Sequence, residues 1–94
     1  MRCLPASVEA YRKTPVFTED SIPAGLTRDH STKAGVWGLI RVTSGALRLS
    51  FADGVPTERL VPGRPGVIAP QQPHAVAADG PVRFFVEFYR VPDS

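Results

Sequence analysis

Three side chains could form a metal site, because imidazole nitrogens and a carboxylate are ligands that first-row divalent metals accept. They are His30 and His74, the only two histidines of the chain, and Glu87. This set would suit Zn, Ni, Mn or Fe(II), with water or a substrate in the open positions. The sequence contains no HxH or HxxxH pair, so the fold would have to bring the three ligands together.

Glu87 lies in an apolar segment that is typical of a β-strand. Alternate residues of a strand point to opposite faces, so one face would carry Val82, Phe84, Val86 and Phe88 and the other Arg83, Phe85, Glu87 and Tyr89. A carboxylate between two aromatic residues needs a cation, because burying an unpaired ion is costly. That cation is either a metal or a basic side chain, for which the candidates are Arg83, Arg90 and Lys33. Alternatively, this face of the strand is solvated.

The elements that must position these residues are short strands, since ten prolines interrupt almost every helical pattern. Only Ser7–Lys13 could hold a helical turn. Ser44-Gly45 and Asp53-Gly54 supply the tight turns of hairpins. The pattern predicts one all-β, antiparallel domain over residues 1–94, a sandwich or small barrel. The predicted strands are Val36–Thr43, Ala46–Phe51, Glu58–Val61, Gly66–Ala69, His74–Ala77 and Val82–Val91.

Composition excludes several classes of protein. The net charge is only +2, and basic and acidic residues are interleaved, which disfavours nucleic-acid binding. No apolar run is long enough to span a membrane and the N-terminus does not resemble a signal peptide, so we expect a cytoplasmic protein. The single Cys3 cannot form an internal disulfide. Neither a phosphate-binding loop nor a nucleophile elbow is present.

A resemblance to the cupin superfamily is carried by the run from Pro62 to Val76, PGRPGVIAPQQPHAV, in which a PG turn, a strand and a proline turn precede His74. The whole of residues 11–91 resembles a narrower group, the cupin-like family related to tellurite-resistance protein B. The motifs that carry this likeness are YRKTPVF from Tyr11, IPAGLTRDHSTKAGVWG from Ile22 and GPVRFFVEFYR from Gly80.

The resemblance implies a cupin-like double-stranded β-helix, a small antiparallel barrel or jelly roll, with a pocket into which His30, His74 and Glu87 project. The chain departs from the usual cupin pattern, because the first motif contributes only His30. The site would then be either an open three-ligand metal site or a site without metal.

Further residues could line this pocket or support its ligands. Asp29 could orient the His30 imidazole or form an ordinary surface pair. Lys33 could bind an oxyanion or be solvated, and Trp37 could line the pocket or lie in the core or a dimer contact. Phe85 and Tyr89 flank Glu87.

Two functions follow as expectations. The first is a metal-binding protein that binds or acts on a small oxyanion or oxidised molecule, with iron-dependent oxygenation as its enzymatic form. The second is a metal-free, small-ligand-binding or stress-response module without catalysis. In either case we expect a homodimer, because a 94-residue barrel has much surface for its volume and sheet edges to cover. The strand around Val16-Phe17 could extend a partner's sheet.

Overall fold

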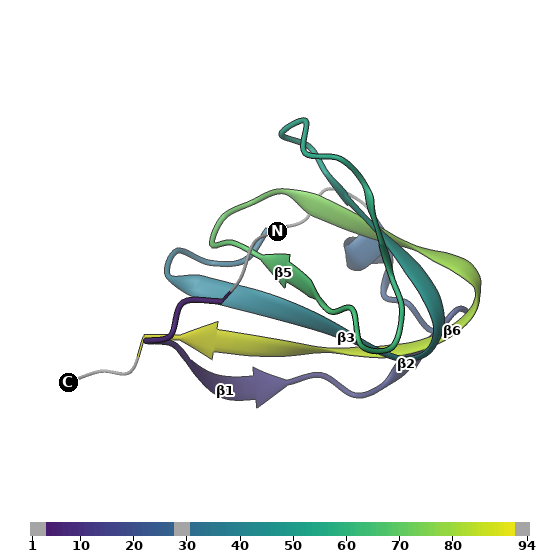
Figure 1. Ribbon diagram of the computed structural model, residues 1–94, viewed down its shortest axis with the longest axis horizontal. Coiled ribbons are helices and arrows are strands. Elements are labelled where there is room, and N and C mark those ends of the chain that lie inside the picture. Colours follow the sequence, from purple (N-terminus) through teal and green to yellow (C-terminus); the bar gives the residue numbers. More distant parts are fainter. Residues whose placement is uncertain (1–3, 28–30, 92–94) are drawn as a thin grey trace.

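Two long antiparallel strands form the centre of the fold (Figure 1). In this computed structural model, which describes residues 4–27 and 31–91, β3 (Val36–Phe51) and β6 (His74–Arg90) run side by side. Their register extends from the pair Val36 and Arg90 to the pair Phe51 and His74. Every other strand is attached to this ribbon.

Four short strands complete a six-stranded antiparallel sheet with the order β1-β6-β3-β4. On one side, β1 (Glu9–Lys13) and β2 (Phe17–Thr18) pair with β6. On the other, β4 (Glu58–Leu60) and β5 (Gly66–Ile68) pair with β3. The prediction of an all-β antiparallel fold is therefore confirmed. The sheet is not a closed barrel, since β1 and β4, the two ends of this order, do not pair with each other within the described residues.

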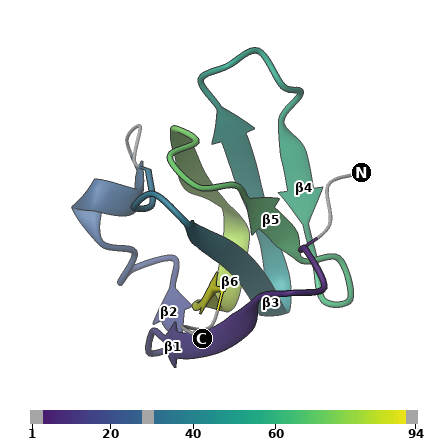
Figure 2. The same ribbon diagram turned by 90° about the vertical axis from the view of Figure 1, so that its left-hand side faces the viewer.

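The ribbon bends sharply near its middle, so that its two halves face each other (Figures 1 and 2). The register shifts on both sides of Gly45, which has a φ of +77°. A Cβ atom on Gly45 would lie 1.9 Å from the Pro81 carbonyl oxygen. Glycine alone fits at this place, because it tolerates positive φ and leaves room for the opposite backbone.

Three predicted local structures differ from those observed. Ser44-Gly45 is not a hairpin turn but a bulge inside β3. In the same way, β6 runs without a break through Gly80 and Pro81, where the sequence predicts two separate strands. The helical turn predicted over Ser7–Lys13 is wrong, because Glu9–Lys13 forms β1.

The hydrophobic core lies between the two halves of the bent sheet. Alternation along β6 places Val82, Phe84 and Val86 on its inner face. All three are buried, and Phe84 has 0% exposure. η1, a 3-10 helix over Ala24–Thr27, contacts β6. No helix in the described part of the chain is long and apolar enough to cross a membrane. The buried core comprises Ile40, Val42, Leu47, Leu49, Leu60, Ile68, Val76, Val82, Phe84 and Val86.

Candidate functional site

An apolar cavity of about 300 Å³ opens between the two halves of the sheet. Its wall combines the inner face of β6 with residues from β2, β3, β5, η1 and the segments that connect them. Most of these residues are aliphatic or aromatic, as in ordinary small-molecule sites. The lining residues are Thr14, Phe17, Pro23, Gly25, Leu26, Thr32, Gly38, Ile40, Ile68, His74, Val76, Phe84, Val86 and Phe88.

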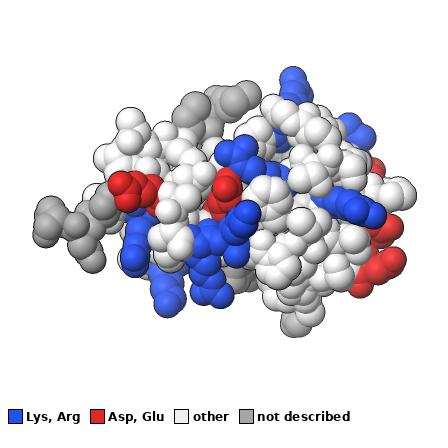
Figure 3. All heavy atoms as spheres, turned by 90° about the horizontal axis from the view of Figure 1, so that it is seen from below, with Lys and Arg blue, Asp and Glu red and all other residues white. Residues whose placement is uncertain are grey.

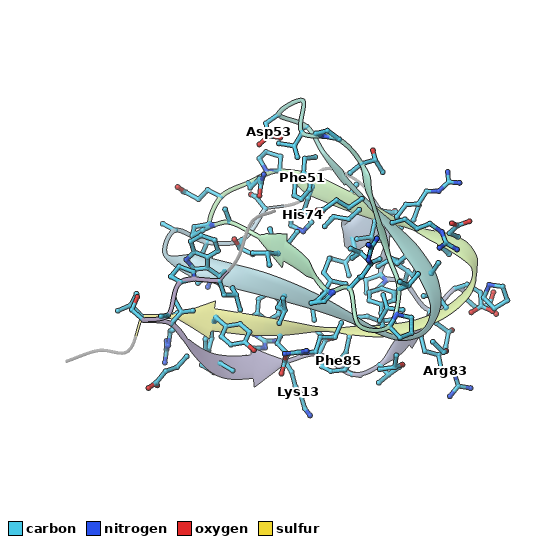
Figure 4. The ribbon with its side chains drawn as sticks, viewed as in Figure 1. Lys13, Phe51, Asp53, His74, Arg83 and Phe85 are labelled. Atoms are coloured by element: carbon cyan, nitrogen blue, oxygen red, sulfur yellow. The ribbon has the colours of Figure 1, made fainter. Side chains whose placement is uncertain are left out.

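His74 is the ionisable group among the described residues of this wall. It is the first residue of β6 and is only 5% exposed, and Figure 4 shows it inside the fold near Phe51, its cross-strand partner. Its Nδ1 atom lies 2.9 Å from the Gln72 carbonyl oxygen. Because a carbonyl oxygen only accepts, Nδ1 is the atom that carries the hydrogen in this bond.

The turn before His74 is held in place by the buried Gln72 side chain. Its amide nitrogen donates to the Asp53 carboxylate at 3.0 Å, and its amide oxygen accepts from the Ala69 backbone N–H at 3.1 Å. These bonds join the loop after β3 to the turn between β5 and β6. The imidazole of His74 therefore has a fixed position.

The hydroxyl groups of the two threonines in the cavity wall form hydrogen bonds with backbone groups. Thr14 Oγ1 accepts from the Val86 N–H at 3.0 Å and donates to the Pro15 carbonyl. Thr32 Oγ1 donates to the Val36 carbonyl at 2.7 Å. Since these bonds satisfy the hydroxyl groups, the cavity presents mainly carbon to a ligand.

Glu87 lies on the other face of β6, outside the cavity. Its carboxylate forms an ion pair with Arg41 of β3 and accepts a hydrogen bond from the Tyr89 hydroxyl at 3.2 Å. The bond to Glu87 raises the pKa of the Arg41 guanidinium above its usual value. The cation that the sequence requires beside Glu87 is thus an arginine from another strand.

The aromatic residues beside Glu87 share its face. Phe85 lies opposite Arg41 in the register, Trp37 opposite Tyr89, and the Lys13 ammonium group is 5.8 Å from the centre of the Phe85 ring. Figure 4 shows Lys13 and Phe85 at the outer edge, away from His74. Seen from that side, the surface mixes basic and acidic side chains (Figure 3).

The structure therefore places two of the predicted ligands, His74 and Glu87, on different faces of β6. His74 is in the cavity, whereas Glu87 and its aromatic neighbours are outside it. Lys33 lies in a second, more polar hollow. His30 and Asp29 lie outside the described residues. No group of three His, Cys, Asp or Glu residues within residues 4–27 and 31–91 is placed to hold a metal, and the three-ligand site stays a prediction.

Two further residues of these surfaces could not be recognised from sequence patterns. Arg41 is 46 positions from Glu87, and only the strand register reveals the pair. Leu26 of η1 reaches the cavity from a segment that shows no strand or helix pattern. Phe84, Val86 and Phe88, in contrast, are found by their alternation.

Comparison with protein families gives a match to the TehB-like domain over residues 12–86. The probable S-adenosyl-L-methionine-dependent methyltransferase TehB of Haemophilus influenzae strain Rd is 40% identical over 38 residues, which are 40% of this chain and 13% of that protein. Its counterpart in strain 10810 is 37% identical over the same length. The match thus covers only a small part of these longer relatives.

Three crystal structures are similar in fold. TehB from Haemophilus influenzae has a TM-score of 0.84 and 26% identity, covering 92% of this chain and 32% of that chain. A protein from Escherichia coli K12 has a TM-score of 0.86 and 25% identity, covering 99% and 100%. DMSP lyase DddQ from Ruegeria pomeroyi has a TM-score of 0.58 and 25% identity, covering 92% and 39%.

Proposed function

Since this chain belongs to the TehB-like domain family, we propose a function for the domain itself: it binds a small, mainly apolar molecule in the cavity beside His74. The observation that carries the proposal is the cavity of about 300 Å³, open between the sheet halves and lined almost wholly by carbon. A volume of this size is at the small end of the range for ligand pockets. Apolar surface that leaves water supplies the binding free energy.

The polar groups of the wall set a limit on the ligand. No Lys, Arg, Asp or Glu is among the described residues that line the cavity. An inorganic oxyanion or a hydrated metal ion placed there would lose its water without gaining a charged partner from these described residues. A mainly apolar ligand is the better match. The metal-binding and catalytic alternatives, and a cupin-type double-stranded β-helix, remain predictions that other measurements must test.

Methyl transfer is not part of this proposal. The chain covers only 32% of the Haemophilus influenzae TehB chain. By contrast, it matches 100% of the Escherichia coli chain. Binding by the domain alone is therefore the function that we propose to test.

Filling the cavity tests the proposal. Val76 is 4% exposed and lines the cavity, so Val76→Phe places a ring where the ligand would lie. We expect octanol to shift the amide NMR signals of lining residues in the unchanged protein. The affinity of Val76→Phe for octanol should be at least tenfold lower, a change of about 1.4 kcal/mol. Val55→Phe makes the same substitution at an exposed position outside the wall, and its affinity should not change.

Circular dichroism and thermal unfolding check that the variants are folded. Should Val76→Phe not fold, Val76→Met occupies the space with an unbranched, adaptable side chain. If octanol does not bind, or binds equally well to a folded cavity-filled variant, the proposed function is wrong.

A further inference from the structure

A second hollow, of about 230 Å³, adjoins the cavity and is more polar. We propose that the two together form one composite site for an amphipathic organic anion, whose apolar part lies in the cavity and whose anionic group lies against Arg12 and Lys33. This inference rests on the proposed function and adds the class of ligand. The residues that line the second hollow are Tyr11, Arg12, Ser31, Thr32, Lys33, Val36 and Phe88.

The charge of the second hollow favours an anion. Arg12 and Lys33 are its two charged lining residues, and no Asp or Glu is among its described lining residues. Neither of the two cations forms an ion pair with a carboxylate of residues 4–27 or 31–91. By contrast, Arg41 and Arg59 have carboxylate partners. Two unneutralised cations in one concave surface attract negative charge.

The chemistry of the lining suits a carboxylate or a similar flat anionic group. A guanidinium presents two parallel N–H donors to a carboxylate, and an ammonium adds a compact charge. Ser31 and Tyr11, which bear hydroxyl groups, also line this hollow. The Arg90 guanidinium lies 4.4 Å from the centre of the Tyr11 ring.

The two hollows have lining residues in common. They therefore lie side by side, and one elongated molecule could occupy both. Thr32 and Phe88 line the cavity and the polar hollow alike. Thr32 is held by its bond to the Val36 carbonyl and by the Gln71 N–H, which donates to the Thr32 carbonyl at 3.2 Å. Phe88 is a residue of the central strand β6. The place where the apolar and the basic surface meet is therefore formed by residues that the fold holds in position.

Calorimetric titration with octanoate and octanol separates the two parts of the site. Both probes have the same chain length, and only octanoate has a charge. We expect octanoate to bind roughly five- to tenfold more tightly than octanol, as two exposed cations would allow. The double variant Arg12→Gln, Lys33→Gln should reduce octanoate affinity to that of octanol and leave octanol unchanged. Arg64→Gln, which removes an exposed charge outside both hollows, should change neither.

The outcomes distinguish the two proposals. If octanol binds and octanoate binds no more tightly, or if the double variant keeps the preference for octanoate, the composite site is wrong and the proposed function stands. If neither probe binds, both are wrong. Inorganic phosphate supplies an anion without an apolar part: equal affinity for phosphate and octanoate would show that the cavity contributes nothing, and would also overturn the composite site.

Discussion

At the scale of single residues, the buried histidine and the outer glutamate have separate roles. His74 is fixed by its bond to the Gln72 carbonyl and lines the cavity. Glu87 neutralises Arg41 on the outer face. The alternation of β6 was enough to predict which residues are inner and which are outer. The partner of Glu87 was not predictable, because the register that brings in Arg41 depends on a bulge and on pairing over a long sequence separation.

Asp79 makes the stability of this chain depend on pH. It lies between Arg59 of β4, at 2.8 Å, and Arg48 of β3, at 3.9 Å, two arginines that face each other directly in the register. The hydrogen bond from Arg59 holds the pKa of the Asp79 carboxyl below its usual value. The carboxylate also offsets the repulsion between the two guanidinium groups.

We predict the sign of the effect from this lowered pKa. The stabilisation is complete above the unfolded pKa of about 4 and is lost as the pH falls through the lower folded pKa. Asp79→Asn cannot titrate, so its free energy of unfolding should be lower than that of the unchanged protein at neutral pH, and the difference should shrink in acid. Urea unfolding between acid and neutral pH measures this. Asp20→Asn, at an exposed loop position, is the control, and a constant difference for Asp79→Asn would contradict the prediction.

At the scale of elements, the bulge at Gly45 decides whether the ribbon bends. The sequence predicted Val36–Thr43 and Ala46–Phe51 as separate strands because Ser44-Gly45 has the residues of a tight turn. Turns and bulges both need glycine at positive φ, so local sequence cannot tell a chain reversal from a bend within a strand. Strand content was predictable, whereas the joining of four predicted strands into β3 and β6 was not.

Gly45→Ala tests the bend directly. The new methyl group would meet the Pro81 carbonyl oxygen at 1.9 Å, at a φ of +77°. We predict a loss of about 3 kcal/mol or more in the free energy of unfolding, measured by urea titration. Gly80→Ala has a similar φ of +80° but nothing within 4 Å of its Cβ, so it should lose only about 1 kcal/mol, from backbone strain alone. Equal losses in the two variants would show that the close approach is not what requires glycine at position 45.

At the scale of the whole molecule, the described chain packs around one core. Its radius of gyration is 12.6 Å, close to the value of about 13 Å expected for a domain of ~100 residues. Phe17 and Thr18, in the segment expected to extend a partner's sheet, pair with β6 of the same chain, and pairing with a second copy stays a prediction. β1 lies at the same side of the sheet, and its five residues are all exposed.

A homodimer stays a prediction, and β1 is the edge that it would cover. Edge strands expose unpaired backbone groups that a second copy can satisfy. We expect light scattering at micromolar concentration to give the mass of two chains. The mass of one chain, 10.2 kDa, would contradict the prediction and would leave the charged residues of β1 as the protection of a solvent-exposed edge.

The pairing of β3 with β6 also has a consequence for the order in which the chain folds. The innermost pair, Phe51 and His74, encloses residues 52–73, while the outermost, Val36 and Arg90, spans most of the domain. Closing a long loop costs more entropy than adding one pair to a ladder that has already formed. We therefore expect the pairs to form in order, from the innermost to the outermost. The bulge at Gly45 lies midway along this path. We therefore expect closure of the loop over residues 52–73 to precede the rest of the zipping, and the cavity to form after the ribbon has passed the bend.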